Sequence, residues 1–430
     1  MSKSTKSARA SSLAANDNSK NQVYLGGDFG VLNTIPAGNP TVKATGSHAK
    51  PIFEAGLNLS WLGANGRFYP APHSKLILYP QYPEVRLSGF LLGCQDAPTE
   101  LMGRTRVPGR LLILGVRDDG ALLAWVGAPD SPANREFLEG ASTGRSERNG
   151  VFHQIPLPEF GAESDRDALL RELRRICGEG WVDSHRLGPH GERLPCEAPN
   201  CGGFTLEAEL GITPNGYSEP DFRGWEVKQH AVPKFGSLAS GPITLMTPEP
   251  TGGVYASKGV VPFLREYGYA DRVGRADRRN FGGIHRAGAA CNLTGLTLTL
   301  LGYDRGSGRI TDASGGIALL DAEGREAAAW PFAGLMAHWN RKHARAAYLP
   351  SVMRVAPARQ YRYGPAVRLG VGTDFLRFLG AVAAGAIYYD PGIKAESWSS
   401  KPVVKRRSQF RIKSGDIPAL YESVEAVNLA

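Results

Sequence analysis

The sequence contains no apolar run of the roughly 18 residues that a membrane-spanning helix needs. Its first 22 residues lack the apolar stretch of a signal peptide, and their Ser, Lys, Ala and Asn content is typical of a flexible tail. Cysteine is scarce, with five in 430 residues, and the number is odd. These absences argue against a membrane protein and a disulfide-rich secreted domain, so we expect a cytoplasmic protein with no membrane partner.

Two of the cysteines, Cys196 and Cys201, lie in the stretch LPCEAPNCGG. Four residues separate them, and no second Cys/His pair with metal-site spacing follows, so the pattern does not favour a zinc site. We expect two reduced thiols without a structural role.

Positive charge is concentrated near the C-terminal end. Residues 331–430 hold 15 Lys/Arg and 6 Asp/Glu, an excess that equals the net charge of +9 of the whole chain. A local basic surface attracts a polyanion, either nucleic acid or acidic lipid. The basic stretches lack an amphipathic helix with a large apolar face, which disfavours a lipid surface.

The length of the chain suits two domains. A helix is predicted in SDRDALLRELRRICGEGW, and the Gly- and Pro-rich stretch HRLGPHGERLPCEAPNCGG after it indicates a linker. In the first domain RLLILGVRDDGALLAWVG predicts a hairpin around an Asp-Asp-Gly turn. The role of that domain stays open between targeting, sensing and DNA contact. The predicted parts are a disordered tail over 1–22, an N-terminal α+β domain over 23–185, a linker over 186–202 and a second domain over 203–430.

The second domain contains a compact group of charged residues in the stretch EPDFRGWEVKQH. A strand would place Glu226, Lys228 and His230 on one face, and Trp225 and Val227 on the other. Acids and a lysine on a polar ridge with an apolar backing suit a metal site. A solvated strand face with an ion pair is the alternative.

The chemistry of phosphodiester hydrolysis fits these residues. Asp221 and Glu226 offer carboxylate oxygens, and the Val227 carbonyl offers a third oxygen, which together suit Mg²⁺. A bound metal ion lowers the pKa of a water and stabilises charge on the attacked phosphate. Lys228 can hold or deprotonate that water and offset the developing negative charge. We therefore predict a Mg²⁺-dependent site in which Mn²⁺ can substitute.

The motif Pro220-Asp221, four residues, Glu226-Val227-Lys228 matches the PD-(D/E)XK nuclease signature. With TLEAELGI before it, PITLMTPEPTGG after it, and GAIYYDPGIK and KRRSQFRI near the C-terminus, residues 200–430 resemble the MvaI/BcnI family of restriction endonucleases. The resemblance implies an α/β domain with a restriction-endonuclease-like mixed central sheet flanked by helices. It also implies endonucleolytic cleavage of double-stranded DNA by a monomer that cuts one strand at a time and leaves 5′-phosphates. The N-terminal domain has no part in the resemblance.

The resemblance further implies a glutamate on the helix before the motif. Thr205 is expected to cap a short helix, LEAELGI, that ends at Gly211. Glu207 is the predicted fourth catalytic residue, and Glu209 is the competing candidate. His230 is a candidate for contact with the scissile backbone, and an exposed histidine without a role explains it equally well.

Three basic stretches are candidate DNA contacts, although each alone also suits a solvated charged face. They are a Gly- and Arg-rich loop over 272–288, a predicted helix over 338–350 and a predicted strand over 405–414. The residues expected to contact DNA are His230, Arg279, His285, Arg341, Arg345, Arg407 and Arg411.

The predicted helix and the predicted strand both segregate their charges. In the strand, Phe410 and Ile412 form an apolar face opposite the basic one. Asp390 is expected in a structural turn before this strand, where it can pair with an arginine. The helix has one basic stripe at i, i+3, i+4 and i+7, formed by His338, Arg341, Lys342 and Arg345.

The biological setting expected for such an enzyme is bacterial defence against foreign DNA. It would act as a restriction enzyme, or as the effector arm of a defence system whose other subunits are its partners. Three alternatives remain open: a nuclease gated by a partner complex, a repair nuclease of the MutH type, and a DNA-binding module without cleavage. The intact Asp, Glu and Lys of the motif argue against the last.

Overall fold

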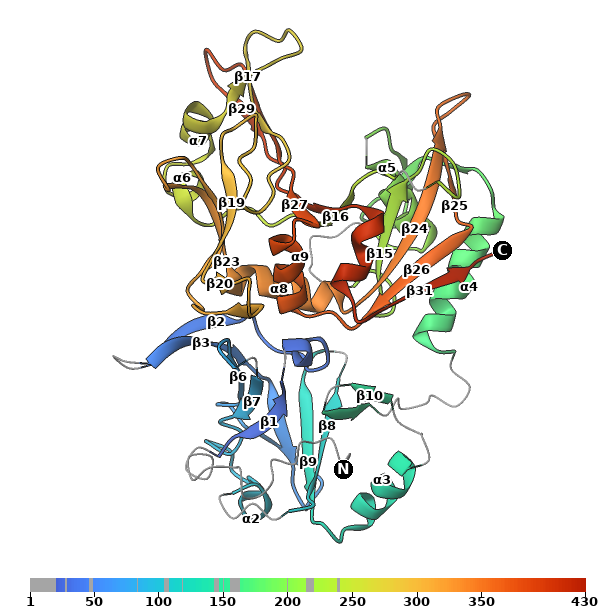
Figure 1. Ribbon diagram of the computed structural model, residues 1–430. Helices are drawn as coiled ribbons and strands as arrows, with labels where there is room; N and C mark the ends of the chain where they lie inside the picture. Colours follow the sequence, from blue (N-terminus) through green and yellow to red (C-terminus); the bar gives the residue numbers. More distant parts are fainter. Residues whose placement is uncertain are drawn as a thin grey trace. The chain divides into compact units, whose positions relative to one another are not determined.

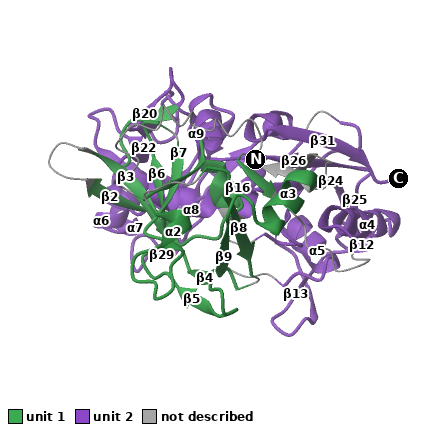
Figure 2. Ribbon diagram, turned by 90° about the horizontal axis from the view of Figure 1, so that it is seen from below, with its two compact units in different colours: residues 1–162, 309–313 green, residues 163–308, 314–430 purple. Residues whose placement is uncertain are grey.

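The computed structural model (Figure 1) describes residues 21–430 except 28, 46–48, 83, 104–107, 118, 143–146, 150, 155–162, 199, 214–219 and 238–239. The chain divides into two compact units, which Figure 2 shows in green and purple. Unit 1 comprises residues 1–162 and 309–313, and unit 2 comprises residues 163–308 and 314–430. Among the described residues, no helix is both long and apolar enough to cross a membrane. The predicted tail falls almost wholly outside the described part.

Unit 1 is built mainly from strands. One sheet is antiparallel with the order β1-β7-β6-β3-β2, and a second has the order β5-β4-β9-β8. The predicted hairpin is confirmed as β8 and β9, which pair from Leu111 with Gly127 to Val116 with Leu122. The strands are β1 Val23–Gly26, β2 Thr41–Thr45, β3 Ala49–Gly56, β4 Leu59–Leu62, β5 Phe68–Pro70, β6 Lys75–Tyr79, β7 Glu84–Ser88, β8 Leu111–Val116, β9 Leu122–Gly127, β10 Glu147–Asn149, β11 Phe152–Gln154 and β21 Arg309–Ile310. The helices are η1 Phe29–Asn33, α2 Thr99–Met102 and α3 Pro132–Ser142.

Unit 2 mixes helices and strands. Its helices are α4 Asp165–Gly178, α5 Cys201–Glu209, α6 Gly253–Ser257, α7 Val260–Tyr267, α8 Phe332–His343, α9 Phe375–Ala383 and η2 Ser414–Leu420. Its strands are β12 Val182–Asp183, β13 His185–Leu187, β14 Arg193–Pro195, β15 Glu226–Ala231, β16 Ile243–Met246, β17 Tyr269–Ala270, β18 Arg278–Gly282, β19 Thr297–Leu301, β20 Tyr303–Asp304, β22 Gly316–Leu320, β23 Glu326–Pro331, β24 Arg345–Arg354, β25 Gln360–Tyr363, β26 Ala366–Val371, β27 Ile387–Tyr389, β28 Gly392–Glu396, β29 Val403–Lys405, β30 Phe410–Ile412 and β31 Ser423–Asn428.

The sheet that carries the charged motif has β24 at its centre (Figure 1). β24 pairs in parallel with β15, and antiparallel with β25 and β26. β12 and β31 extend the sheet beyond β25 and β26. Helices α4 and α5 pack on one face, where Leu173 and Leu206 join Val227, Leu349 and Leu369 in a buried core. The predicted mixed central sheet flanked by helices is confirmed.

The division between the units differs from the predicted boundary at 186–202. Helix α4 begins after Ser164, whose hydroxyl accepts from the N–H of Asp167 at 3.1 Å, and it buries its apolar side in the core of unit 2. The stretch predicted as a linker forms the hairpin β13–β14 and the start of α5. Its glycines serve the hairpin turn, in which Gly188 N–H donates to the Glu192 carbonyl at 2.8 Å.

Candidate active site

A two-residue turn separates the two acids of the motif. Phe222 and Trp225 exchange two backbone hydrogen bonds of 2.9 and 2.8 Å. The residues between them, Arg223 and Gly224, have φ angles of 43° and 75°, and two successive positive values are typical of a type I′ turn. The turn reverses the chain immediately before β15. The four-residue spacing of the motif is therefore the length of a tight hairpin.

This turn brings Asp221 against the start of β15. The backbone N–H of Val227 donates to Asp221 Oδ2 at 3.0 Å, which holds the carboxylate beside Glu226. Trp225 and Val227 are 3% and 4% exposed in the core, as the strand alternation predicts. Glu226 and Lys228 consequently point to the opposite face of the strand.

Glu226 is completely buried among charged groups. Lys228 Nζ contacts its Oε1 directly, and Lys342 Nζ lies 3.5 Å from the same oxygen and 3.9 Å from Asp221 Oδ1. The other oxygen, Oε2, is buried and accepts no hydrogen bond from the described residues. An unsatisfied buried carboxylate oxygen is costly, so this atom suits a cation ligand.

Burial and crowding perturb the acid–base behaviour of the cluster. Burial, together with the charge of Asp221, raises the pKa of Glu226 to about 7 against the opposing effect of Lys228 and Lys342. The same two causes raise the pKa of Glu207 to about 7. Burial acts to lower the pKa of Lys228, but the attraction of Glu226 and Asp221 outweighs it and raises this pKa. Lys228 is therefore held as an ammonium group, the form that offsets negative charge.

Helix α5 directs Glu207, rather than Glu209, toward this cluster. The pKa of Glu207 is raised by burial first and then by the negative charge of Asp221. The Glu209 carboxylate instead lies 3.3 Å from both His185 and Arg193 of the hairpin β13–β14. The charges of Asp221, Lys228 and Lys342 act on Glu207, whereas Glu209 pairs with the hairpin, which favours Glu207 as the third acid of the site.

The helix begins four residues before Thr205, so the prediction that Thr205 caps it is wrong. Thr205 is buried inside the helix, and its hydroxyl donates to the His185 carbonyl at 3.0 Å. A Cβ at Gly202 would lie 2.9 Å from Gln229 Oε1, so glycine lets the helix approach β15 closely. The helix gives way to Gly211, where φ is 76°, as predicted.

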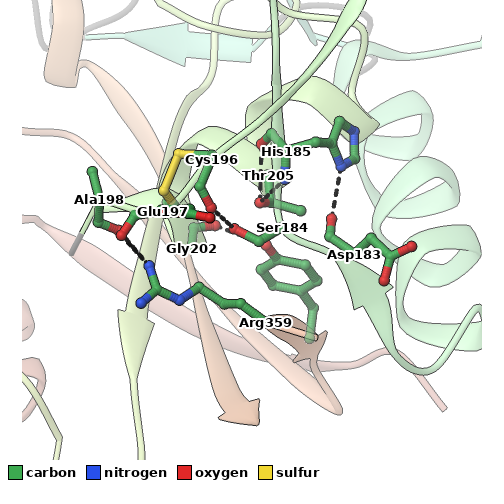
Figure 3. The surroundings of a disulfide bond; sticks show 11 residues. Asp183, Ser184, His185, Cys196, Glu197, Ala198, Gly202, Thr205 and Arg359 are labelled. Carbon is green, nitrogen blue, oxygen red and sulfur yellow. Dashed lines mark hydrogen bonds between the residues drawn. A yellow bond between two sulfur atoms is a disulfide. The ribbon is translucent and has the colours of Figure 1, made fainter. Parts of the chain in front are cut away.

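Figure 3 shows a disulfide between Cys196 and Cys201, which joins the end of the hairpin β13–β14 to the first residue of α5. The expectation of two reduced thiols is wrong, because the chain returns from β14 into α5 with the two Cα atoms 5.7 Å apart, a separation that a disulfide spans. Beside it the Ser184 hydroxyl donates to the Cys196 carbonyl at 2.6 Å. The helix that carries Glu207 is therefore anchored covalently near its start.

Over residues 170–421 the sequence matches the model of the MvaI/BcnI restriction endonuclease family. The chain belongs to this family. The match spans more than half of the chain and includes every residue of the acid and lysine cluster. The resemblance of residues 200–430 is thus confirmed, and the chain is a DNA endonuclease of a kind that uses divalent metal ions.

Two solved structures are similar to this member of the MvaI/BcnI family. Restriction endonuclease MvaI in complex with its cognate DNA substrate covers 63% of this chain and 100% of its own, at 17% identity and a TM-score of 0.46. MvaI in the absence of DNA covers 62% of this chain and 99% of its own, at 16% identity and a TM-score of 0.34. No curated protein matches the chain.

Lys342 belongs to the acid cluster, although its helical spacing in the sequence predicts a place in a basic stripe that contacts DNA. The structure places it among the acids because the last turn of α8 is fixed by its neighbour His343. That histidine is fully buried, stacks on the Trp339 ring at a centroid distance of 4.2 Å, and lies with its Nε2 3.0 Å from the Leu245 carbonyl oxygen. The sequence signal that could have located Lys342 is the stretch WNRKH, because its Trp339 and His343 lie one helical turn apart and both are buried.

The segment predicted as one helix over 338–350 is a helix followed by a strand. The apolar run AAYLP belongs to β24 and is mostly buried, which overrides the helical spacing of the basic residues. Arg345 accordingly opens the strand, with its guanidinium 5.5 Å from the centroid of the Trp225 ring. Arg341 lies in α8, and its side chain is outside the described part of the structure.

In the stretch 272–288 one named candidate, His285, is buried and the other, Arg279, is half-buried. Arg279 lies in β18, and its guanidinium donates to two carbonyls at the end of α7 at 2.7 and 2.9 Å. His285 is 0% exposed, with its Nε2 2.8 Å from Thr294 Oγ1. These contacts stabilise the fold and leave His285 no surface for DNA. The arginines that this loop exposes are Arg272 and Arg275.

The segment over 405–414 contains the end of β29 and all of β30. Phe410 and Ile412 are buried, as the alternation predicts. Arg411 donates to Asp390 Oδ2 at 2.6 Å, so the expected pairing of Asp390 with an arginine of this segment is confirmed. Arg407 precedes the strand and is exposed, and its contact with DNA stays a prediction.

His230 lies on β15 two residues beyond Lys228 but below the surface, at 8% exposed. Burial, with a smaller contribution from the nearby Arg368, lowers the pKa of His230 to about 4. The imidazole is therefore neutral at physiological pH. Because His230 is buried, the alternative of an exposed histidine without a role is not supported. A contact of His230 with DNA stays a prediction.

Proposed function

We propose that unit 2 hydrolyses phosphodiester bonds of double-stranded DNA with Mg²⁺ as its metal ion, and that Mn²⁺ can substitute. The observation that carries this proposal is the convergence of Asp221, Glu226 and Lys228 at the start of β15, with Glu207 and Lys342 beside them. Carboxylate oxygens are the ligands that hard divalent cations prefer.

The residues present fit such an ion. Glu226 Oε2 is a buried oxygen without a hydrogen bond from the described residues, and Asp221 lies beside it. Within that part of the chain no three His, Cys, Asp or Glu side chains gather into a complete metal site. Asp221 and Glu226 would therefore hold the ion with the Val227 carbonyl, leaving other positions to water and substrate oxygens. When bound, the ion would lower the pKa of a water molecule and stabilise negative charge on the phosphate.

The other charged residues have separate tasks in this scheme. Lys228 contacts Glu226 directly, and from there its side chain would orient water and offset charge on the phosphate. Lys342 adds a second positive charge from another element of the fold. Glu207, whose pKa is about 7, can exchange a proton near neutral pH and is the better candidate for proton transfer.

We further propose that the enzyme acts as a monomer in the cytoplasm, in restriction or another defence against foreign DNA. Its membership of the MvaI/BcnI restriction endonuclease family supports this setting. The positive excess of residues 331–430 supports a polyanionic substrate.

A plasmid assay tests the catalytic proposal. Supercoiled, unmethylated plasmid is incubated with the full-length protein and Mg²⁺, Mn²⁺ or EDTA, for the wild type and for Lys228→Ala. We expect a nicked form and then discrete fragments with either ion, and none in EDTA or with the variant. Lys258→Ala, which changes an exposed lysine on α6's C-terminal side, is the matched control and should cut normally. Cleavage that persists in Lys228→Ala, or its absence in the wild type, would contradict the proposal.

A further inference from the structure

Arg223 occupies a backbone conformation that few long side chains adopt. Its φ of 43° lies in the left-handed region, which glycine and asparagine enter readily and other residues enter at a cost. In the described part of the chain, three non-glycine residues have positive φ: Asn21, Arg223 and Ser397. Asparagine or glycine would form the same type I′ turn with less strain. The turn alone therefore does not explain an arginine here.

Arg223 is exposed, and its guanidinium makes no hydrogen bond or ion pair with any described residue. The neighbouring basic groups are occupied: Arg345 lies 3.8 Å from Asp165 Oδ2, and Lys342 lies among the acids. Among the described residues, Arg223 is thus a positive charge without a partner, two positions from Asp221 of the catalytic cluster.

The turn holds the backbone of Arg223 in a defined conformation. The hydrogen bonds between Phe222 and Trp225 close it on both sides, and Arg345 covers Gly224 so tightly that a Cβ there would lie 2.4 Å from Arg345 Nη2. Arg223 is the exposed residue of the turn and stands two positions from Asp221. A DNA strand with its scissile phosphate at the acids would pass this side chain.

We propose that Arg223 binds a backbone phosphate of the DNA beside the scissile one, and that its left-handed conformation keeps the guanidinium in position for this contact. The proposal rests on the proposed function, because it places DNA at the acid cluster. A guanidinium binds phosphate through two parallel hydrogen bonds. Strain of this kind persists where function repays it. A phosphate contact carries no base preference, so Arg223 positions the DNA without choosing its sequence.

A binding titration in EDTA, where no cleavage occurs, tests the contact. The full-length protein is titrated onto a fluorescent duplex of about 30 base pairs at several salt concentrations, and the slope of log K against log [salt] is measured. For Arg223→Asn we expect this slope to become less steep by about 0.9, the value for one lost phosphate contact, with several-fold weaker binding. Arg223→Lys, which keeps the charge, should keep the slope. Asparagine tolerates positive φ, so the melting temperature of Arg223→Asn should rise by about 2–4 °C.

Ser397→Gly is the matched control, since it relieves a positive φ of 54° without removing a charge. It should raise the melting temperature and leave the salt slope unchanged. If Arg223→Asn melts at a lower temperature than the wild type, its weaker binding could reflect lost stability, and Arg223→Glu is then the test. We expect Arg223→Glu to bind the duplex more than about tenfold more weakly than the wild type. Wild-type slope and affinity in both the Asn and Glu variants would overturn the role of Arg223. That result leaves Mg²⁺-dependent cleavage by the wild type intact, whereas loss of the proposed function is seen as no cleavage by the wild type.

Discussion

Replacement of Lys342 by methionine removes one of two ammonium groups from the acid cluster while keeping an unbranched side chain. Its Nζ lies 3.5 Å from Glu226 Oε1 and 3.9 Å from Asp221 Oδ1. At an effective dielectric constant of about 20, unit charges at these distances attract by roughly 4–5 kcal/mol each. Desolvation of the ammonium group offsets most of this attraction, and Lys228 continues to contact Glu226. We therefore expect a net loss of about 2 kcal/mol in the free energy of unfolding.

Calorimetric melting of the full-length protein in EDTA measures this loss. Because a chain of two units need not unfold in one step, the transition of unit 2 has to be resolved from that of unit 1. A loss of about 2 kcal/mol lowers the melting temperature of a unit of this size by roughly 4–8 °C. In the plasmid assay we expect the cleavage rate to fall by about 10²-fold, as when one group that stabilises transition-state charge is lost.

The control is Lys258→Met. Lys258 Nζ lies 3.7 Å from Glu266 Oε2, and 60% of the lysine side chain is exposed, so this pair contributes at most about 1 kcal/mol. Lys258→Met should therefore melt and cut nearly as the wild type does. If Lys342→Met behaved like Lys258→Met in both assays, the ammonium group of Lys342 would have no role in the cluster, and the electrostatic reasoning above would be refuted.

Further predictions concern the acids, the turn and the buried histidine. Glu207→Gln should slow cleavage about 10²-fold and raise the melting temperature at pH 8, because it removes a buried charge. Glu209→Gln should lower the melting temperature, because it weakens the ion pairs with the hairpin, and should leave cleavage unchanged. Equal effects of the two variants in both assays would contradict this prediction. Gly224→Ala should cost roughly 2 kcal/mol in urea unfolding, because positive φ penalises a Cβ and Arg345 must move; wild-type stability would refute it. Burial lowers the pKa of His230 to about 4. Between pH 6.5 and 4 the unfolded chain therefore binds more protons than the folded chain, and the free energy of unfolding decreases as the pH is lowered, by up to about 3 kcal/mol. His230→Asn should remove this part of the pH dependence of urea unfolding, and an unchanged dependence would exclude His230 as its source.

Local patterns in the sequence were sufficient for the motif and its backing. The alternation around Glu226 predicts correctly that Trp225 and Val227 face a core, and the Asp-Asp-Gly turn predicts the hairpin of β8 and β9. The same holds for Phe410 and Ile412 in β30. In each case the spacing of apolar residues decides the structure, and a single strand is enough to reveal it.

Features that depend on contacts between distant segments could not be predicted in this way. Lys342 and Arg345 share a helical stripe in the sequence, yet burial of the run after them starts a strand, so Lys342 lies in a helix and Arg345 in β24. The Gly- and Arg-rich composition of its loop predicts that His285 contacts DNA, but packing buries His285 inside the protein. Tertiary packing overrides local pattern at all these positions.

The parallel pairing of β15 with β24 also governs when the enzyme becomes able to cut. Glu226 pairs with Ala346, and Lys228 with Tyr348, so the motif waits for a partner made more than a hundred residues later. At a synthesis rate of about 5–20 residues per second, that delay is roughly 6–24 s. During this time a growing chain carries Asp221, Glu226 and Lys228 without the neighbouring strand or Lys342. Chains that end before β24 lack this pairing, so we expect them to be inactive in the plasmid assay.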